Sequence, residues 1–124
     1  MNDLEKYNKI FDEFCEWVVG IEEDDPLPPE IHYIYFVFWG DCGVNTLQYT
    51  GCEYEPKTIC SCDYFPLEAQ FFYSRDYLKL PKEQAKQFAK IFVQDIMHLG
   101  YFEQLFFGKI VKFVEYGETL KKRI

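Results

Sequence analysis

A nearly continuous apolar segment occupies residues 31–39, with the sequence IHYIYFVFW. Its side chains are β-branched or aromatic at every position except His32. The segment has about half the length that a membrane-spanning helix requires, and its composition favours strand over helix. Such a segment is typical of a strand in the middle of a sheet, with both faces buried. The sequence therefore predicts a sheet that needs cover on both sides.

Three later segments have strand patterns. A turn signal at residues 40–43, which contains two glycines, predicts an antiparallel return strand over residues 44–49. Residues 67–73 alternate between two sets of side chains, which predicts a third strand with one drier face. The C-terminal tail fits both a helical stripe and a strand, and its β-branched run favours a strand over residues 110–116.

Two segments have the three- and four-residue spacing of apolar side chains that predicts an amphipathic helix. The first covers residues 2–19, with Asn2 as its cap and Gly20 as its end. The second begins at Pro81 and ends at Gly100. The apolar stripes are Leu4, Tyr7, Phe11, Phe14 and Val18 in the first helix and Ala85, Phe88, Ala89, Phe92, Ile96 and Leu99 in the second.

These elements and the length of the chain predict a single α+β domain over residues 1–124. We expect an antiparallel sheet of three to four strands that packs against an N-terminal helix and a second amphipathic helix in the C-terminal half. Aromatic residues make up 20% of the chain. A central strand that needs apolar cover on both faces explains why so small a domain contains so many large side chains.

The charge of the chain is uneven along its length. Residues 1–30 have a net charge of −8, residues 31–80 of −3 and residues 81–124 of +3. The acidic patch consists of Asp12, Glu13, Glu16, Glu22, Glu23, Asp24 and Asp25. A basic ridge on the second predicted helix consists of Lys82, Lys86 and Lys90. Such rows are ordinarily the solvated faces of amphipathic helices. The alternative is that the acidic patch docks a protein partner with a basic surface, because clustered like charge raises association rates.

Twenty-five aromatic side chains are more than a core of this size hides comfortably. Tyrosines in or near the irregular segments have polar tips that tolerate partial exposure, and tyrosine is enriched in protein interfaces. The tyrosines of this kind are Tyr49, Tyr54, Tyr64, Tyr73 and Tyr77, of which the first three are the predicted binding residues. The alternative interpretation is a heavily aromatic core with an amphipathic rim.

Four cysteines fall close together in the middle of the chain, at Cys42, Cys52, Cys60 and Cys62. Four clustered thiols are the ligand set of a structural zinc site. Their spacing lacks the paired CxxC knuckles of zinc ribbons, so buried apolar filling is the alternative interpretation. A reactive thiol in this region needs an imidazole or another cation nearby, and the chain has two histidines, His32 and His98.

The N-terminus has neither a basic start nor an apolar segment, which predicts a cytoplasmic protein with reduced thiols and no membrane partner. The sequence lacks a glycine-rich phosphate loop, an HExxH helix and a nucleophile elbow. Its acidic charge argues against direct binding to nucleic acid. We therefore predict a small acidic protein of inhibitor or immunity type that acts by protein–protein binding, without catalysis or a cofactor.

Three alternatives stay open at this point. One is a zinc- or thiol-dependent module at residues 42–62. Another is an inhibitor that mimics nucleic acid and blocks a DNA- or RNA-binding enzyme. The third is a homo-oligomer that buries its surplus aromatic surface against a second copy.

Overall fold

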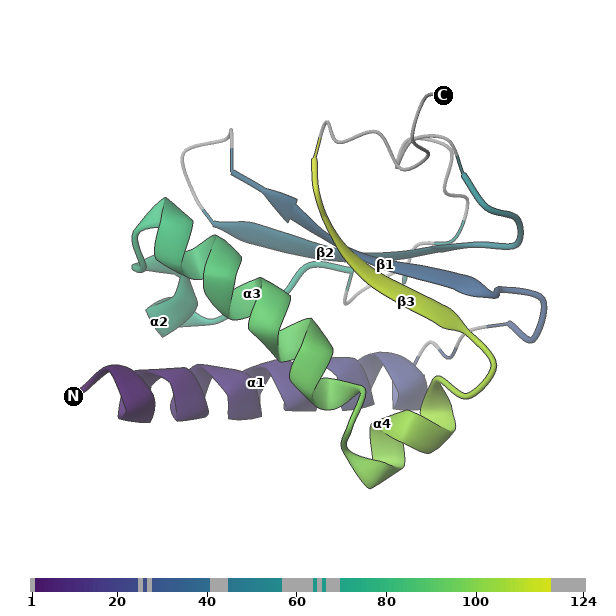
Figure 1. Ribbon diagram of the computed structural model, residues 1–124, viewed down its shortest axis with the longest axis horizontal. Helices are drawn as coiled ribbons and strands as arrows, with labels where there is room; N and C mark the ends of the chain where they lie inside the picture. Colours follow the sequence, from purple (N-terminus) through teal and green to yellow (C-terminus); the bar gives the residue numbers. More distant parts are fainter. Residues whose placement is uncertain are drawn as a thin grey trace.

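A three-stranded mixed sheet with helices packed against one of its faces forms the α+β fold (Figure 1). The computed structural model describes residues 2–24, 26, 28–40, 45–56, 64, 66 and 70–116. Along this part of the chain the elements are α1 (Asp3–Asp24), β1 (Tyr33–Trp39), β2 (Thr46–Cys52), α2 (Arg75–Leu78), α3 (Lys82–Ile96), α4 (Gly100–Leu105) and β3 (Ile110–Glu115). The predicted class, with three strands and two long amphipathic helices, is confirmed.

β1 is the central strand, as its apolar sequence predicts. The strand order is β2-β1-β3, and five of the seven residues of β1 are buried. β2 pairs with β1 antiparallel, with Tyr33 opposite Cys52 and Trp39 opposite Thr46. β3 pairs with the other edge of β1 in parallel, with Tyr33 opposite Ile110. Both edges of β1 are therefore hydrogen-bonded to neighbouring strands.

The direction of β3 differs from the antiparallel sheet that we expected. After β2 the chain passes through α2, α3 and α4, and it returns at the end of the sheet where β1 begins (Figure 1). There the Ile110 N–H donates to the carbonyl of His32 at 2.8 Å. Apolar periodicity identifies a strand but not its direction, which the helical crossover sets.

The strand predicted over residues 67–73 is an irregular segment in its described part. Phe71 forms a single bridge with Gln48 on the outer edge of β2, and residues 67–69 lie outside the described residues. Phe72 is buried in the core between exposed neighbours. The drier face predicted at Phe71 and Tyr73 is therefore wrong, because both are exposed, and Phe72 of the opposite set enters the core from a segment that crosses the edge of β2.

α1 begins at the predicted cap and extends past its predicted end. The Glu5 N–H donates to Asn2 Oδ1 at 2.8 Å, and Asn2 Nδ2 donates to the Glu5 carboxylate at 3.1 Å, which together cap the first turn. The end predicted at Gly20 is wrong, because the helix continues to Asp24. Ile21 is buried in the core. Burial of this side chain contributes about 2 kcal/mol, more than the roughly 1 kcal/mol that glycine costs inside a helix.

The second long helix begins where Pro81 predicts and ends earlier than Gly100 predicts. Pro81 occupies the N-cap of α3, and the last residue of α3 is Ile96. Gly100 instead begins the short helix α4, which covers the first part of the helical stripe that the C-terminal tail also fits. Leu99 belongs to the predicted buried stripe but is exposed in the turn between the two helices. α3 therefore ends about one helical turn earlier than predicted, and α4 connects it to β3.

Aromatic side chains from α1, α3 and β1 meet in one cluster between the helices and the sheet. Phe14 of α1 is fully buried at its centre, with ring centroids 5.5 Å from Phe36 and 5.3 Å from Phe92. The other rings that contact Phe14 are those of Phe11, Trp17 and Phe72. Tilted and edge-to-face pairs at such distances add to the stabilisation that burial provides. This cluster fixes α1 and α3 against β1.

The opposite face of the sheet has a smaller apolar cluster, which consists of Tyr35, Val37, Cys52 and Val114. At its margin the ring of Trp39 stacks on Tyr116, with 3.7 Å between the ring centroids. Alternate side chains of β1 therefore enter different clusters, because successive side chains of a strand point to opposite faces. The prediction that this strand is buried on both faces is confirmed.

Replacing Phe14 with alanine should lower the free energy of unfolding by about 3–5 kcal/mol, because the cavity left among its neighbouring rings cannot collapse. Chemical denaturation followed by circular dichroism measures this change. Phe107→Ala is the matched control, because Phe107 is 86% exposed, and its effect should stay within about 0.5 kcal/mol. Equal effects of the two substitutions would show that Phe14 is not the centre of the core.

Candidate functional site

One side of α1 has a row of carboxylates that faces away from the core. We define the acidic stripe as Glu5, Asp12, Glu16 and Glu23. Steps of seven, four and seven residues place these four side chains on one side of the helix. All four are exposed. The buried residues of α1 lie on its other side and are Ile10, Phe14, Val18 and Ile21. The periodicity that buries the apolar side of α1 thus also exposes the acidic stripe.

The acidic stripe has no ion-pair partner among the described residues. The ion pairs in this part of the chain join Lys9 to Asp76 at 2.6 Å, and Lys86 to Glu83 and Glu115 at 3.2 and 3.3 Å. Lys86, in the middle of the basic ridge, is therefore paired with carboxylates of α3 and β3. It does not neutralise α1, so the acidic stripe stays open to another molecule.

The other predicted acidic residues lie outside the stripe. Glu13 is half-buried, and its Oε1 is buried with no hydrogen-bond partner in the described structure. Glu22 is half-buried, and burial raises the pKa of its carboxyl, an effect that Lys109 opposes. Asp24 is exposed at the end of α1, and Asp25 lies outside the described residues. The structure thus unites three of the predicted residues with Glu5, which their seven-residue spacing could have revealed.

The candidate tyrosines divide between core and surface. Tyr49 is 2% exposed and packs against rings of α1 and β1, and burial raises the pKa of its hydroxyl. Tyr77 is also buried, and its hydroxyl donates to the carbonyl of Ala85 at 2.9 Å. Tyr54 is 77% exposed, whereas Tyr64 is half-buried. The expectation of an exposed tyrosine is therefore wrong for Tyr49 and Tyr77, because both occupy inward-facing positions.

Cys52 is the described member of the predicted zinc set. It is buried in the smaller apolar cluster and is disulfide-bonded, and its partner cysteine lies outside the described residues. Cys42, Cys60 and Cys62 also lie outside the described residues. Within the described chain, no three metal-binding side chains gather in one place. A disulfide sulfur offers no thiolate to a metal, so the zinc hypothesis requires the reduced form of the chain.

Cys15 is a free thiol on α1, half-buried beside the acidic stripe. Burial and the nearby carboxylates of Asp12 and Glu16 raise the pKa of this thiol to about 11. At neutral pH only about one molecule in ten thousand then has a thiolate here. Because the thiolate is the nucleophile, the surroundings of Cys15 oppose a catalytic role.

The two histidines lie at the surface on different parts of the fold. The sequence predicts His32 in the buried strand, but it is exposed and precedes β1. Its backbone N–H donates to the carbonyl of Cys52 at 3.3 Å, which extends the pairing of β1 with β2. His98 is exposed in the turn that follows α3. Within the described residues, the free thiol of Cys15 lies on α1, a different element from the position of either histidine.

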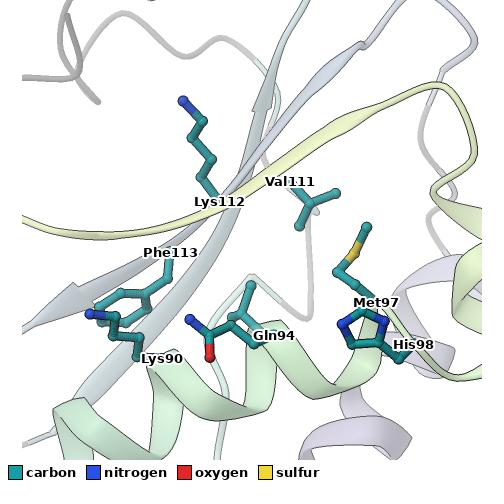
Figure 2. A pocket seen from close by; sticks show the side chains of 8 residues that line it. Lys90, Gln94, Met97, His98, Val111, Lys112 and Phe113 are labelled. Carbon is teal, nitrogen blue, oxygen red and sulfur yellow. The ribbon is translucent and has the colours of Figure 1, made fainter.

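A groove of about 360 Å³ runs between α3 and β3, where the sequence analysis proposed no site (Figure 2). On the α3 side, Lys90, Gln94 and His98 follow one another at four-residue steps along the rim. Val93 and Met97 line the groove between them and β3. The spacing of these residues on α3 is visible in the sequence. The position of α3 beside β3 is not, because it depends on the crossover.

The β3 side of the groove is formed by Val111, Lys112 and Phe113. Figure 2 shows the side chains of Val111 and Phe113 directed towards α3, and that of Lys112 directed to the other face of the sheet. The groove therefore has an apolar interior with the amino group of Lys90 at its α3 margin. This combination suits a ligand that is both apolar and anionic.

Comparison with known proteins leaves the family open. No protein-family model, no curated protein and no solved structure matches the chain at a significant level. Among the described helices, none combines the length with the apolar composition that a membrane crossing needs. The acidic stripe and the groove are therefore the features from which a function can be inferred.

Iodoacetamide should alkylate Cys15 slowly at pH 7. The alkylation rate should rise with pH and follow an apparent pKa of about 11. Peptide mass mapping measures the reaction at this residue. Asp12→Asn combined with Glu16→Gln should accelerate it at any fixed pH below 11, because removing two neighbouring carboxylates lowers the thiol pKa. The substitution pair Glu30→Gln and Glu103→Gln, at exposed carboxylates on other parts of the chain, is the control. An apparent pKa near 8 in the unchanged protein would contradict this account.

Peptide mapping without reductant should recover Cys52 in a disulfide-linked peptide. Protein purified without chelator or reductant should then lack stoichiometric zinc, because the oxidised sulfur is not a metal ligand. Metal analysis of the same protein after reduction and zinc addition provides the comparison. Stoichiometric zinc in the protein that was never reduced would contradict the expected result.

Proposed function

We propose that this protein is a non-catalytic binding protein whose acidic stripe docks a basic surface of a partner protein. The observation that carries the proposal is that the exposed carboxylates of the acidic stripe form no ion pair with any described residue. Glu5 and Glu23 are separated by about 27 Å along the helix axis. This length suits a basic helix or a basic strip on a folded partner.

The charges of the acidic stripe are close enough to act together. Neighbouring members are about 6–10 Å apart along the helix, and the Debye length in physiological salt is about 8 Å. Like charges at this spacing repel one another mildly in the free protein. A partner with lysines and arginines relieves the repulsion, and the same field steers the encounter.

The density of charge favours a protein partner over imitation of nucleic acid. Duplex DNA carries about sixteen phosphate charges over 27 Å of its axis. The acidic stripe has four carboxylates over this length. Over this length the acidic stripe therefore presents only about a quarter of the negative charges that duplex DNA presents to a phosphate-binding site. A protein surface with a few basic side chains is the better match.

Neutralising Asp12→Asn, Glu16→Gln and Glu23→Gln together should slow association with the partner about tenfold at low salt and reduce the salt dependence of the rate. Glu5 is retained because its carboxylate caps α1. Affinity capture from native cells with wild-type protein identifies the partner, and biolayer interferometry measures the rates.

The matched control is the triple variant Glu30→Gln, Glu55→Gln and Glu103→Gln. It removes the same number of charges at exposed positions outside the acidic stripe. Its association rate should stay within about twofold of wild type, because charges beyond a Debye length contribute little. If the stripe variant associates as fast as wild type, or if no protein distinguishes the two triple variants, the proposal is wrong.

A further inference from the structure

The two edge strands of the sheet, β2 and β3, differ in whether a described segment pairs with their outer side. Along the outer edge of β2, the segment that follows it forms bridges through Tyr64 to Gly51 and through Phe71 to Gln48. β3 is the other edge strand. No described residue pairs with its outer side. Within the part of the chain that the structure describes, the outer backbone edge of β3 is therefore open, next to the groove.

The hydrogen bonds at the two ends of β3 show which backbone groups face outward. The N–H groups of Ile110 and Tyr116 donate to carbonyls of residues 32 and 38 beside and within β1. In a parallel ladder, alternate residues direct their backbone groups to the same neighbour. The even-numbered residues of β3 therefore bond to β1. The N–H and C=O groups of Val111, Phe113 and Glu115 point to the open edge.

The margins of this edge are cationic. Lys90 on α3 and Lys112 on β3 are exposed, and neither forms an ion pair in the described structure. Of the carboxylates near this edge, Glu115 binds Lys86 and Asp95 accepts from the hydroxyl of Tyr7. Burial raises the pKa of Tyr35, the β1 partner of Lys112, and the carboxylate of Glu55 lies close enough to raise it further. The free cations lie on both sides of β3, because Lys90 lines the α3 groove and Lys112 points to the opposite face (Figure 2).

We infer that the β3 edge binds an extended acidic segment of a partner protein by strand addition. Backbone hydrogen bonds to Val111, Phe113 and Glu115 supply the part of the affinity that does not depend on the side chains of the added strand. Side chains on alternate positions of the added strand enter the α3 groove over Val93 and Met97 or lie beside Lys112 on the other face. Carboxylates on the added strand pair with the two free lysines. This site takes a partner of opposite charge to the acidic stripe and does not depend on it.

A second copy of this chain is a poorer occupant of the same edge. Antiparallel pairing of two β3 strands brings the two Lys112 side chains towards each other on one face, and like charges in neighbouring cross-strand positions destabilise a sheet. Each copy would also bring Lys90 to the shared groove. An acidic strand removes this repulsion and replaces it with attraction.

The probe is a fluorescein-labelled peptide of about eight residues in which pairs of glutamates alternate with pairs of valines, so that carboxylates face both sides of the added strand, and its length covers β3. Fluorescence polarisation should show saturable binding to the wild-type protein. Lys90→Glu combined with Lys112→Glu should weaken the binding at least about tenfold, because each substitution places a carboxylate opposite a carboxylate. A lysine–valine peptide should show the reverse preference and bind the doubly substituted protein better than wild type.

Val111→Pro tests the backbone bonds directly. It removes an N–H that faces the open edge and leaves the β1 ladder intact, a position where strands tolerate proline. It should abolish peptide binding, whereas Val111→Ala, which loses the same side-chain packing but keeps the N–H, should retain most of it. Thermal unfolding verifies that both variants are folded. If Val111→Pro is unfolded, a glutamate–valine peptide N-methylated at alternate residues supplies the test, and it should not bind wild type.

Three results would overturn the inference. One is the absence of saturable binding of the glutamate–valine peptide to wild-type protein. The second is equal binding to wild type and to the Lys90→Glu, Lys112→Glu protein. The third is a dimer in light scattering that Val111→Pro dissociates, which would identify a second copy as the occupant. None of these outcomes affects the acidic stripe, because the two tests use different residues and probes of opposite charge.

Discussion

Burial of β1 on both faces is the constraint on which the rest of the fold depends. Ile34, Phe36 and Phe38 point into the helical layer, and Tyr35 and Val37 into the smaller cluster on the other side. A strand with no polar face cannot lie at the edge of a sheet or at its surface. It therefore needs a neighbour along each edge and apolar cover on each face. β2, β3 and the helices are placed accordingly.

The aromatic composition follows from the same constraint. Phe14 reaches Phe36 of β1 and Phe92 of α3, so a single ring links the three elements. The hydroxyl of Tyr7 adds a hydrogen bond from α1 to Asp95 of α3. With its apolar side committed in this way, α1 has its other side in water, and the acidic stripe occupies that side. Core packing thus decides which carboxylates can act as one surface.

The protein has two binding candidates of opposite charge at separate places on one fold. The acidic stripe lies on the exposed side of α1. Lys90 lies on the α3 side of the groove and Lys112 on the opposite face of β3 (Figure 2). Ion pairs within the chain do not neutralise these two surfaces. Lys86 pairs with Glu83 and Glu115, whereas Lys90 and Lys112 form no ion pair within the described structure. The first candidate depends on side-chain charge alone. The second adds backbone groups on the outer side of β3 with which no described residue pairs.

The sequence by itself determined the central strand, the cap of α1, the start of α3, the strand at β3 and the α+β class, because local apolar periodicity and capping side chains encode each of these. It also located the acidic region, although without its division into the acidic stripe and the half-buried Glu13 and Glu22. Tertiary structure alone decided the parallel direction of β3, the continuation of α1 through Gly20 and the burial of Tyr49. Each of these depends on contacts between residues far apart in the chain. Tertiary structure alone also decided the groove and the outer edge of β3, because both depend on the crossover that brings α3 beside β3.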